Sequence, residues 1–254
     1  MNESVWDILR RLWQQVWDRV KWRVVWTGFA FGVGTFATWW YREAVFVLLL
    51  VPSGGDLSPF GGKPVFTEIT GMMGASIRLA LTGGRFAAVP VGTIGIITLF
   101  QPLLPRQLRR FITIFLPATA LCFAAGVAFA FFVMLPAGLN FLLHFGDGIA
   151  VPLITITSYM GLLTGIMFSM GVVFELPLAM FLLAKMRIVS HRQLANLKVQ
   201  FLFMPVAAFT LGAILTPGMD PVNAIFIAVP FILLYEVGLF LAWLARPRQR
   251  AEGD

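Results

Sequence analysis

Apolar residues form six long runs along this chain, and short polar segments separate them. The runs cover residues 24–41, 79–99, 111–135, 158–184, 201–215 and 222–245. Most of them reach about 18 residues, the length that an α-helix needs to cross the hydrocarbon core of a bilayer. The pattern therefore predicts an all-α integral membrane protein with six transmembrane helices.

The six runs and their connections occupy nearly the whole chain of 254 residues. Hydrophobic residues make up 59% of it and charged residues 12%, which excludes a soluble globular domain. We therefore predict a single polytopic membrane domain over residues 1–254. It comprises an amphipathic N-terminal helix at 1–23, a six-span bundle at 24–245 and a basic tail at 246–254.

Basic residues are unevenly distributed among the polar segments. Fifteen of the 19 Lys and Arg residues lie before the first run, between the second and third, between the fourth and fifth, and after the sixth. Because Lys and Arg in short loops favour the cytoplasmic side, both termini are predicted to be cytoplasmic. The formal net charge of +7 then reflects membrane topology and lipid headgroups rather than nucleic-acid binding.

The polar segments have predicted structure of their own. Before the first run, apolar residues recur at spacings of three and four, which predicts a helix lying in the cytoplasmic interface. On the other side, Pro and Gly residues predict a long loop at 51–78, and a second loop at 136–157 is expected to contain a short helix at 141–144. The fifth run is short, about 22 Å as a helix, which indicates either local bilayer thinning or a loose boundary.

Glu175 is the strongest functional signal, because it lies inside the fourth run about ten residues before Lys185. An ionised carboxylate at that depth costs at least a few kcal/mol. Pro177 follows it and leaves the carbonyl of Val173 in need of a donor, which a protonated Glu175 could supply. Glu175 is interpreted as an intramembrane contact for a partner helix or substrate; the alternative is a neutral packing carboxyl or one that faces a water pocket.

Other polar or small residues in the runs have structural interpretations. Glu236 lies near the cytoplasmic end of the sixth run and is expected to reach the headgroups. Arg85, about one and a half turns into the second run, is expected to extend toward the other surface. Two pairs at GxxxG spacing, Gly28 with Gly32 and Gly161 with Gly165, are predicted to pack helices together inside the protein.

Enzyme and cofactor motifs are absent from the sequence. The two histidines, His144 and His191, belong to no HExxH or Ser/His/Asp arrangement, and no nucleotide-binding P-loop occurs. Cys122 is the single cysteine, so an intramolecular disulfide and a zinc site made of cysteine pairs are excluded. We predict a protein that is not an enzyme and has no cofactor or metal.

Three stretches resemble the TatC family, the multispanning subunit of the twin-arginine protein translocase. They are GVAFAFFVMLPAGLNFLLHF at 126–145, MGVVFELPLAMFLLAKMRIVS at 170–190 and LTPGMDPVNAIFIAVPFILLYEVGLF at 215–240. The second stretch has the family's intramembrane glutamate and proline as Glu175 and Pro177. The third has pattern residues at Thr216, Pro217, Asp220, Pro221, Pro230 and Glu236.

The resemblance implies a concave six-helix bundle in a bacterial-type cytoplasmic membrane. It implies that the chain recognises twin-arginine signal peptides of folded cargo, recruits single-span partner subunits of the TatA and TatB type, and uses the proton-motive force. It also implies that the chain can form a homo-oligomer. The positions that it implies for binding signal peptides and partners are Gln15, Arg19, Gln107, Arg109, Glu175, Pro177, Asn223 and Glu236.

The chain departs from the family pattern where recognition is expected. Gln15 stands where the family's N-terminal helix usually has a glutamate, and Leu108 stands where its first cytoplasmic loop has another. Trp17 replaces the first of two spaced arginines, whereas Arg19 keeps the second. In the last hairpin, Ala224 beside Asn223 replaces a usual glutamine.

Three hypotheses therefore compete. The first is a working translocase subunit with a divergent recognition face that uses Gln15, Gln101 or Gln107 with backbone carbonyls. The second is a scaffold paralogue that binds partners but no longer reads the arginine pair. The third is a small-molecule or ion transporter in which Glu175 titrates.

Overall fold

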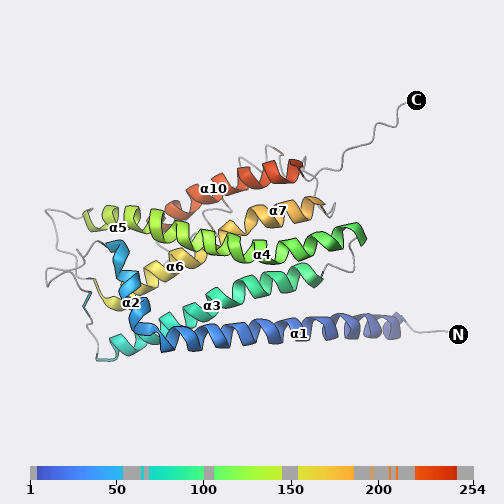
Figure 1. Ribbon diagram of the computed structural model, residues 1–254, viewed down its shortest axis with the longest axis horizontal. Helices are drawn as coiled ribbons and strands as arrows, with labels where there is room; N and C mark the ends of the chain where they lie inside the picture. Colours follow the sequence, from blue (N-terminus) through green and yellow to red (C-terminus); the bar gives the residue numbers. More distant parts are fainter. Residues whose placement is uncertain are drawn as a thin grey trace. The chain divides into compact units, whose positions relative to one another are not determined.

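The computed structural model describes residues 5–53, 64–65, 69–99, 106–144, 154–185 and 221–244, together with positions 196, 206 and 210. Within these ranges the elements are helices (Figure 1). One isolated β-bridge links Val65 to Thr155. The chain forms two compact units: residues 1–41 with 80–120, and residues 42–79 with 121–254. The all-α prediction is confirmed.

The first unit contains α1 (Val5–Trp40), most of α3 (Gly71–Leu99) and the first part of α4 (Arg106–Phe129). Glycines bring α1 and α3 together. A Cβ built on Gly34 would lie 2.8 Å from the carbonyl oxygen of Gly83, and one on Gly84 would lie 2.7 Å from the carbonyl oxygen of Phe31. Because real Cβ atoms do not approach backbone atoms so closely, only glycine permits this contact between the two helix backbones.

The N-terminal segment differs from its prediction. Residues 5–23 and the first predicted span form one helix, α1, of 36 residues or about 54 Å. The separate interfacial helix is therefore not a separate element. The reason is local: residues 19–27 contain neither Pro nor Gly, so nothing in the backbone ends the helix there.

The second unit contains α2 (Arg42–Leu50), η1 (Val51–Ser53), the start of α3 and the end of α4. It continues through a π-helical turn, η3 (Ala130–Met134), into α5 (Leu135–His144), and then α6 (Ile156–Phe174), α7 (Leu176–Lys185) and α10 (Pro221–Leu244). α10 packs mainly on α7 and also on α6. Its buried stripe has helical spacing and consists of Ile227, Phe231, Tyr235, Gly238, Leu239 and Ala242.

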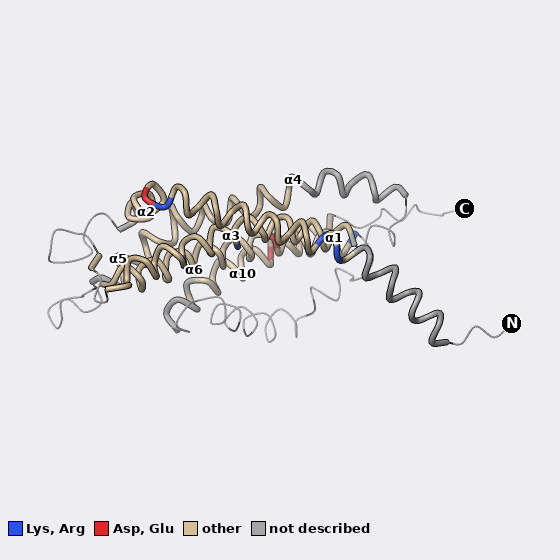
Figure 2. Tube along the Cα trace, turned by 90° about the horizontal axis from the view of Figure 1, so that it is seen from below, with Lys and Arg blue, Asp and Glu red and all other residues tan. Residues whose placement is uncertain are grey.

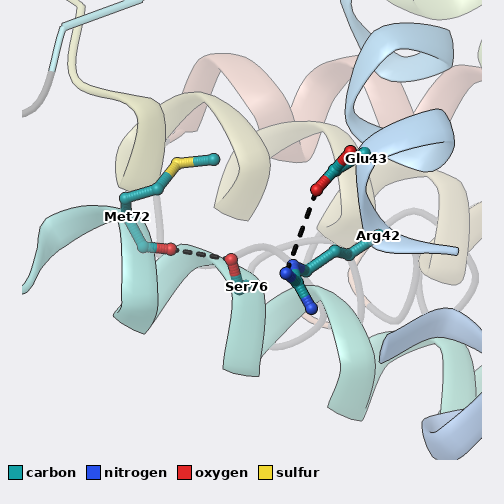
Figure 3. Close-up of polar contacts among 4 residues, drawn as sticks. All are labelled: Arg42, Glu43, Met72 and Ser76. Carbon is teal, nitrogen blue, oxygen red and sulfur yellow. Dashed lines mark hydrogen bonds and ion pairs between the residues drawn. The ribbon is translucent and has the colours of Figure 1, made fainter. Parts of the chain in front are cut away.

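A pair of charged residues begins α2. The Nη2 of Arg42 lies 3.9 Å from the Oε1 of Glu43, and nearby on α3 the Ser76 hydroxyl donates to the carbonyl of Met72 at 2.8 Å (Figure 3). Charged positions are otherwise sparse along the described helices (Figure 2). Both observations agree with helices that cross an apolar phase and expose charge at their ends.

Four helical segments in the described part of the chain are long and apolar enough to cross a membrane: 71–98, 117–142, 156–185 and 227–244. They correspond to the second, third, fourth and sixth predicted spans. The first predicted span lies in α1, whose many Trp, Thr and Gly residues make it less apolar. The fifth, 201–215, lies outside the described residues apart from positions 206 and 210.

The end of the third span was predicted wrongly. A loop was expected to begin at Pro136, with a short helix only at 141–144, but the helix continues through Pro136 to His144. The π-helical turn explains why: the Leu135 N–H donates to the carbonyl of Ala130, five residues back. This widened turn leaves room for the proline ring that would obstruct a regular α-helix.

Hydrogen bonds in the second unit connect Val65 and the end of α2 to the start of α6. The Val65 N–H donates to the carbonyl of Ile154 at 3.1 Å, and the Ile156 N–H donates to the carbonyl of Val65 at 2.8 Å. The buried Tyr159 hydroxyl donates to the carbonyl of Leu49 at 2.9 Å, near the end of α2. A helix end has carbonyls without intrahelical donors, so Tyr159 acts as a cap from a distant part of the chain.

Replacing Tyr159 with Phe should lower the free energy of unfolding by about 1–3 kcal/mol, because a buried carbonyl loses its donor. The measurement is denaturant or thermal unfolding in detergent. Tyr41→Phe is the matched control, since the Tyr41 side chain is 64% exposed. Equal stability of the two variants would contradict the capping role.

Candidate functional site

Glu175 lies at the junction between α6 and α7, where the helix is interrupted for one residue. Its N–H is directed to the carbonyls of Val172 and Val173, and the bond to Val172 is 3.1 Å long. The helix resumes when the Ala179 N–H donates to the carbonyl of Glu175 at 2.9 Å. The carbonyl of Val173 therefore already has a backbone donor, and it does not require the carboxyl that was expected to serve it.

Pro177 causes the interruption. It is the second residue of α7 and is buried, and it has no N–H to continue the regular hydrogen-bond ladder. The apolar span nevertheless continues across the break from Ile156 to Lys185. At 1.5 Å per residue, Glu175 lies about 15 Å from Lys185 along the axis, deep within the span as predicted.

The Oε1 atom of Glu175 is buried. On one side of the site, α4 crosses α6 at very close range: a Cβ on Gly126 would lie 2.9 Å from the Cα of Gly171. The Phe123 ring lies against Gly171, 2.5 Å from where its Cβ would be. Gly171 precedes Glu175 by four residues, about one turn along the same helix. The carboxyl therefore lies beside a tight helix crossing.

On the other side of the site, α7 packs on α10. A Cβ on Gly238 would lie 2.5 Å from the sulfur of Met180 and 3.3 Å from the Cα of Pro177. Glu236, two residues before Gly238, is exposed, so it lies on the face of α10 that points away from α7. The structure therefore does not bring Glu236 together with Glu175 and Pro177.

For the remaining predicted binding residues, the structure describes the helical backbone but not the side chains. Gln15 and Arg19 are in α1, Gln107 and Arg109 are in the first turn of α4, and Asn223 is in the first turn of α10. Leu108 lies between Gln107 and Arg109 in α4. Their backbone is helical, and their roles stay predictions.

Because α3 begins at Gly71, eight residues before the predicted span, Arg85 lies near the middle of a 29-residue helix. Its Nη2 donates to the hydroxyl of buried Thr82 at 3.0 Å. The extension of Arg85 toward the membrane surface stays a prediction.

The prediction of close helix contacts is wrong for Gly28, Gly32 and Gly161: nothing lies within 4 Å of a Cβ built on any of them among the described residues. Gly165, which pairs with Gly161 in the motif, is buried in α6. The contacts involve Gly34, Gly83, Gly84, Gly126, Gly171 and Gly238 instead.

As for metals, no group of three His, Cys, Asp or Glu side chains that could hold an ion occurs among the described residues.

Comparison with known proteins gives a consistent result. Residues 16–230 match the family of Sec-independent protein translocase protein (TatC). The TatC protein of Carboxydothermus hydrogenoformans is 32% identical over 217 residues, 85% of this chain and 86% of that protein. That of Koribacter versatilis is 30% identical over 236 residues, 92% of this chain and 85% of that protein.

The fold also matches a solved structure. The crystal structure of the twin arginine translocase receptor TatC superposes with a TM-score of 0.78 and 27% identity, covering 91% of this chain and 99% of that one. The predicted membrane fold class is thereby confirmed. Together with the sequence matches, this likeness confirms the resemblance first inferred from three stretches. The chain belongs to the TatC family of Sec-independent protein translocase proteins, which are translocase components and not enzymes.

Proposed function

We propose that this chain is the receptor subunit of a twin-arginine translocase in a bacterial-type cytoplasmic membrane, with both termini in the cytoplasm. In this role it binds twin-arginine signal peptides and single-span partner subunits, and it exports folded proteins with the proton-motive force. The observation that carries the proposal is a buried carboxyl, Glu175, at a helix break inside an apolar span of a TatC-family chain. The similar solved structure is that of a twin arginine translocase receptor, which supports the receptor role.

Glu175 is suited to bind another helix within the membrane. A carboxyl at that depth is costly unless it is hydrogen-bonded or neutral, so a partner that supplies a donor gains affinity there. The break at Pro177 adds irregular backbone, which membrane proteins retain where it is covered by protein. Gly126 and Gly238 hold α4 and α10 close on either side, so the carboxyl has a defined position.

Recognition of the signal peptide is proposed for the cytoplasmic ends of α1 and α4. A substrate arginine pair requires acceptors, and charge-assisted bonds to carboxylates are the strongest of these. This chain offers amides instead, at Gln15 and Gln107, with Arg19 and Arg109 beside them. An amide oxygen accepts hydrogen bonds without a full charge, so arginine recognition is expected to be weaker than with glutamates.

The scaffold-paralogue hypothesis is kept as the second candidate, because Gln15 and Leu108 stand where the family has glutamates. In that case Glu175 would still bind partner helices, whereas the cytoplasmic ends would not distinguish arginine from lysine. The transporter hypothesis has no comparable support, because the relatives that match most of the chain are translocase proteins.

The test is site-specific photo-crosslinking from positions 15, 108 and 175 in membranes where this chain is the sole receptor. The membranes also contain the single-span partner subunits, and the probes are a twin-arginine signal peptide and its twin-lysine counterpart. Arginine-dependent adducts at 15 and 108 are expected for a receptor. Adducts only at 175, and only with single-span partners, would establish the scaffold paralogue, and no adducts at any position would refute both roles.

A further inference from the structure

One contact in the first unit joins α1, which contains one of the segments proposed for signal-peptide recognition, to the end of α3, the helix that precedes the other segment. The Nη2 of Arg23, on α1, donates to the carbonyl oxygen of Thr98 at 2.8 Å. Thr98 is the next-to-last residue of α3, and the last turn of that helix contains no basic residue of its own. The cation that compensates the negative end of α3 therefore comes from α1.

The contact is built into the packing of both helices. The Cβ of Arg23 lies 3.5 Å from where a Cβ on Gly95 would be, so the stem of Arg23 lies along α3 one turn before Thr98. The Thr27 hydroxyl donates to the carbonyl of Arg23 at 2.9 Å, and Thr27 in turn lies against Gly92. The Nη1 atom of Arg23 is buried. Arg23 is therefore held between the helices and does not extend freely into solvent.

The position of Arg23 relates it to the recognition residues. Gln15, Arg19 and Arg23 are spaced four residues apart on one helix, which places them along one face of α1. Beyond Thr98, α3 ends at residue 99, and Gln107 and Arg109 follow in the first turn of α4. A single hydrogen bond therefore joins α1, on which Gln15, Arg19 and Arg23 share one face, to the end of α3. The next helix described, α4, has Gln107 in its first turn.

We propose that Arg23 is a positioning residue of the recognition surface: by capping the C-terminus of α3 it fixes the register between the Gln15 face of α1 and the start of α4. This inference rests on the proposed receptor function. Arg23 need not touch the signal peptide. It acts through the placement of Gln15 and Gln107, whose amides form hydrogen bonds only at short range and in defined directions.

The test compares Arg23→Met, which keeps the apolar stem and removes every donor, with Arg23→Lys, which keeps a cation and a donor. Arg10→Met is the matched control: it removes the same charge from the same helix, about 140° around the axis from Arg23. Each full-length variant is prepared in lipid nanodiscs on a Cys122→Ala background with spin labels at positions 14 and 104. The distance distribution between labels and the affinity for a synthetic twin-arginine signal peptide are measured on the same samples.

For Arg23→Met we expect a broadened or shifted label distance and about tenfold weaker peptide affinity, the effect of losing one charge-assisted hydrogen bond. Arg23→Lys should fall between it and the unsubstituted chain, and Arg10→Met should change neither quantity. An unchanged distance in Arg23→Met overturns the cap, and a changed distance with unchanged affinity overturns the positioning role. If the unsubstituted chain does not prefer twin-arginine over twin-lysine peptide, the receptor function fails, and the distance measurement still decides whether Arg23 fixes the register.

Discussion

Replacing Glu175 with Ala should abolish export and weaken partner association at least about tenfold while leaving membrane insertion intact. The carboxyl lies in an apolar span, where one hydrogen bond to a charged or strongly polar group contributes about 1.5–3 kcal/mol. Removing it leaves the backbone break unchanged, because the carbonyls of Val172 and Val173 receive the backbone N–H of residue 175. The effect should therefore appear in binding and not in folding. The measurements are export of a folded twin-arginine reporter and co-purification of a single-span partner.

Two variants make this prediction specific. Glu175→Gln keeps the size and the hydrogen-bonding capacity of the side chain and should retain most of the association. Glu43→Ala removes an exposed carboxylate whose surface pair with Arg42 contributes little, so export should be unaffected. Normal export by Glu175→Ala as the sole receptor would refute the intramembrane contact.

The sequence predicts the helical spans well because their signal is strong and local. A long apolar run with a polar segment at each end leaves the backbone few alternatives in a bilayer, and α6 with α7 matches the predicted fourth span within two residues. The ends of the helices are harder to predict. The continuation through Pro136 depends on a π-helical turn, and the length of α3 depends on where its helix starts outside the apolar run. Neither has a reliable sequence signal.

The candidate site was predicted in part. Glu175 and Pro177 stand out because a charge and a proline are unusual inside an apolar run, and the structure places them side by side at a break. The glycine contacts could not be chosen from spacing alone. Gly28 and Gly32 have the motif, but Gly34, Gly83 and Gly84 form the contact, since it depends on which face of α1 meets α3. In the sequence, Arg23 is one of several basic residues before the first apolar run, and its bond to Thr98 joins positions 75 residues apart, which no local pattern predicts.

The second large effect is expected at Gly126, where α4 crosses α6. An added methyl group on Gly126 would meet the carbonyl oxygen of Met170 and would lie 2.9 Å from the Cα of Gly171. These are backbone atoms, which cannot rotate away as a side chain could, so the helices must separate. Gly126→Ala should therefore lower the free energy of unfolding by about 1–3 kcal/mol, although alanine favours helix more than glycine does.

Gly161→Ala, on α6 itself, is the control that separates packing from helix propensity. Nothing lies within 4 Å of a Cβ at Gly161, so this substitution should be neutral or stabilise the protein by up to about 1 kcal/mol. Both variants are compared by unfolding in detergent. Because the crossing at Gly126 adjoins Glu175, Gly126→Ala should also weaken partner association under conditions where the protein remains folded. Equal stability of the two variants would mean that α4 and α6 do not meet at Gly126, and the defined position proposed for the Glu175 carboxyl would lose its structural basis.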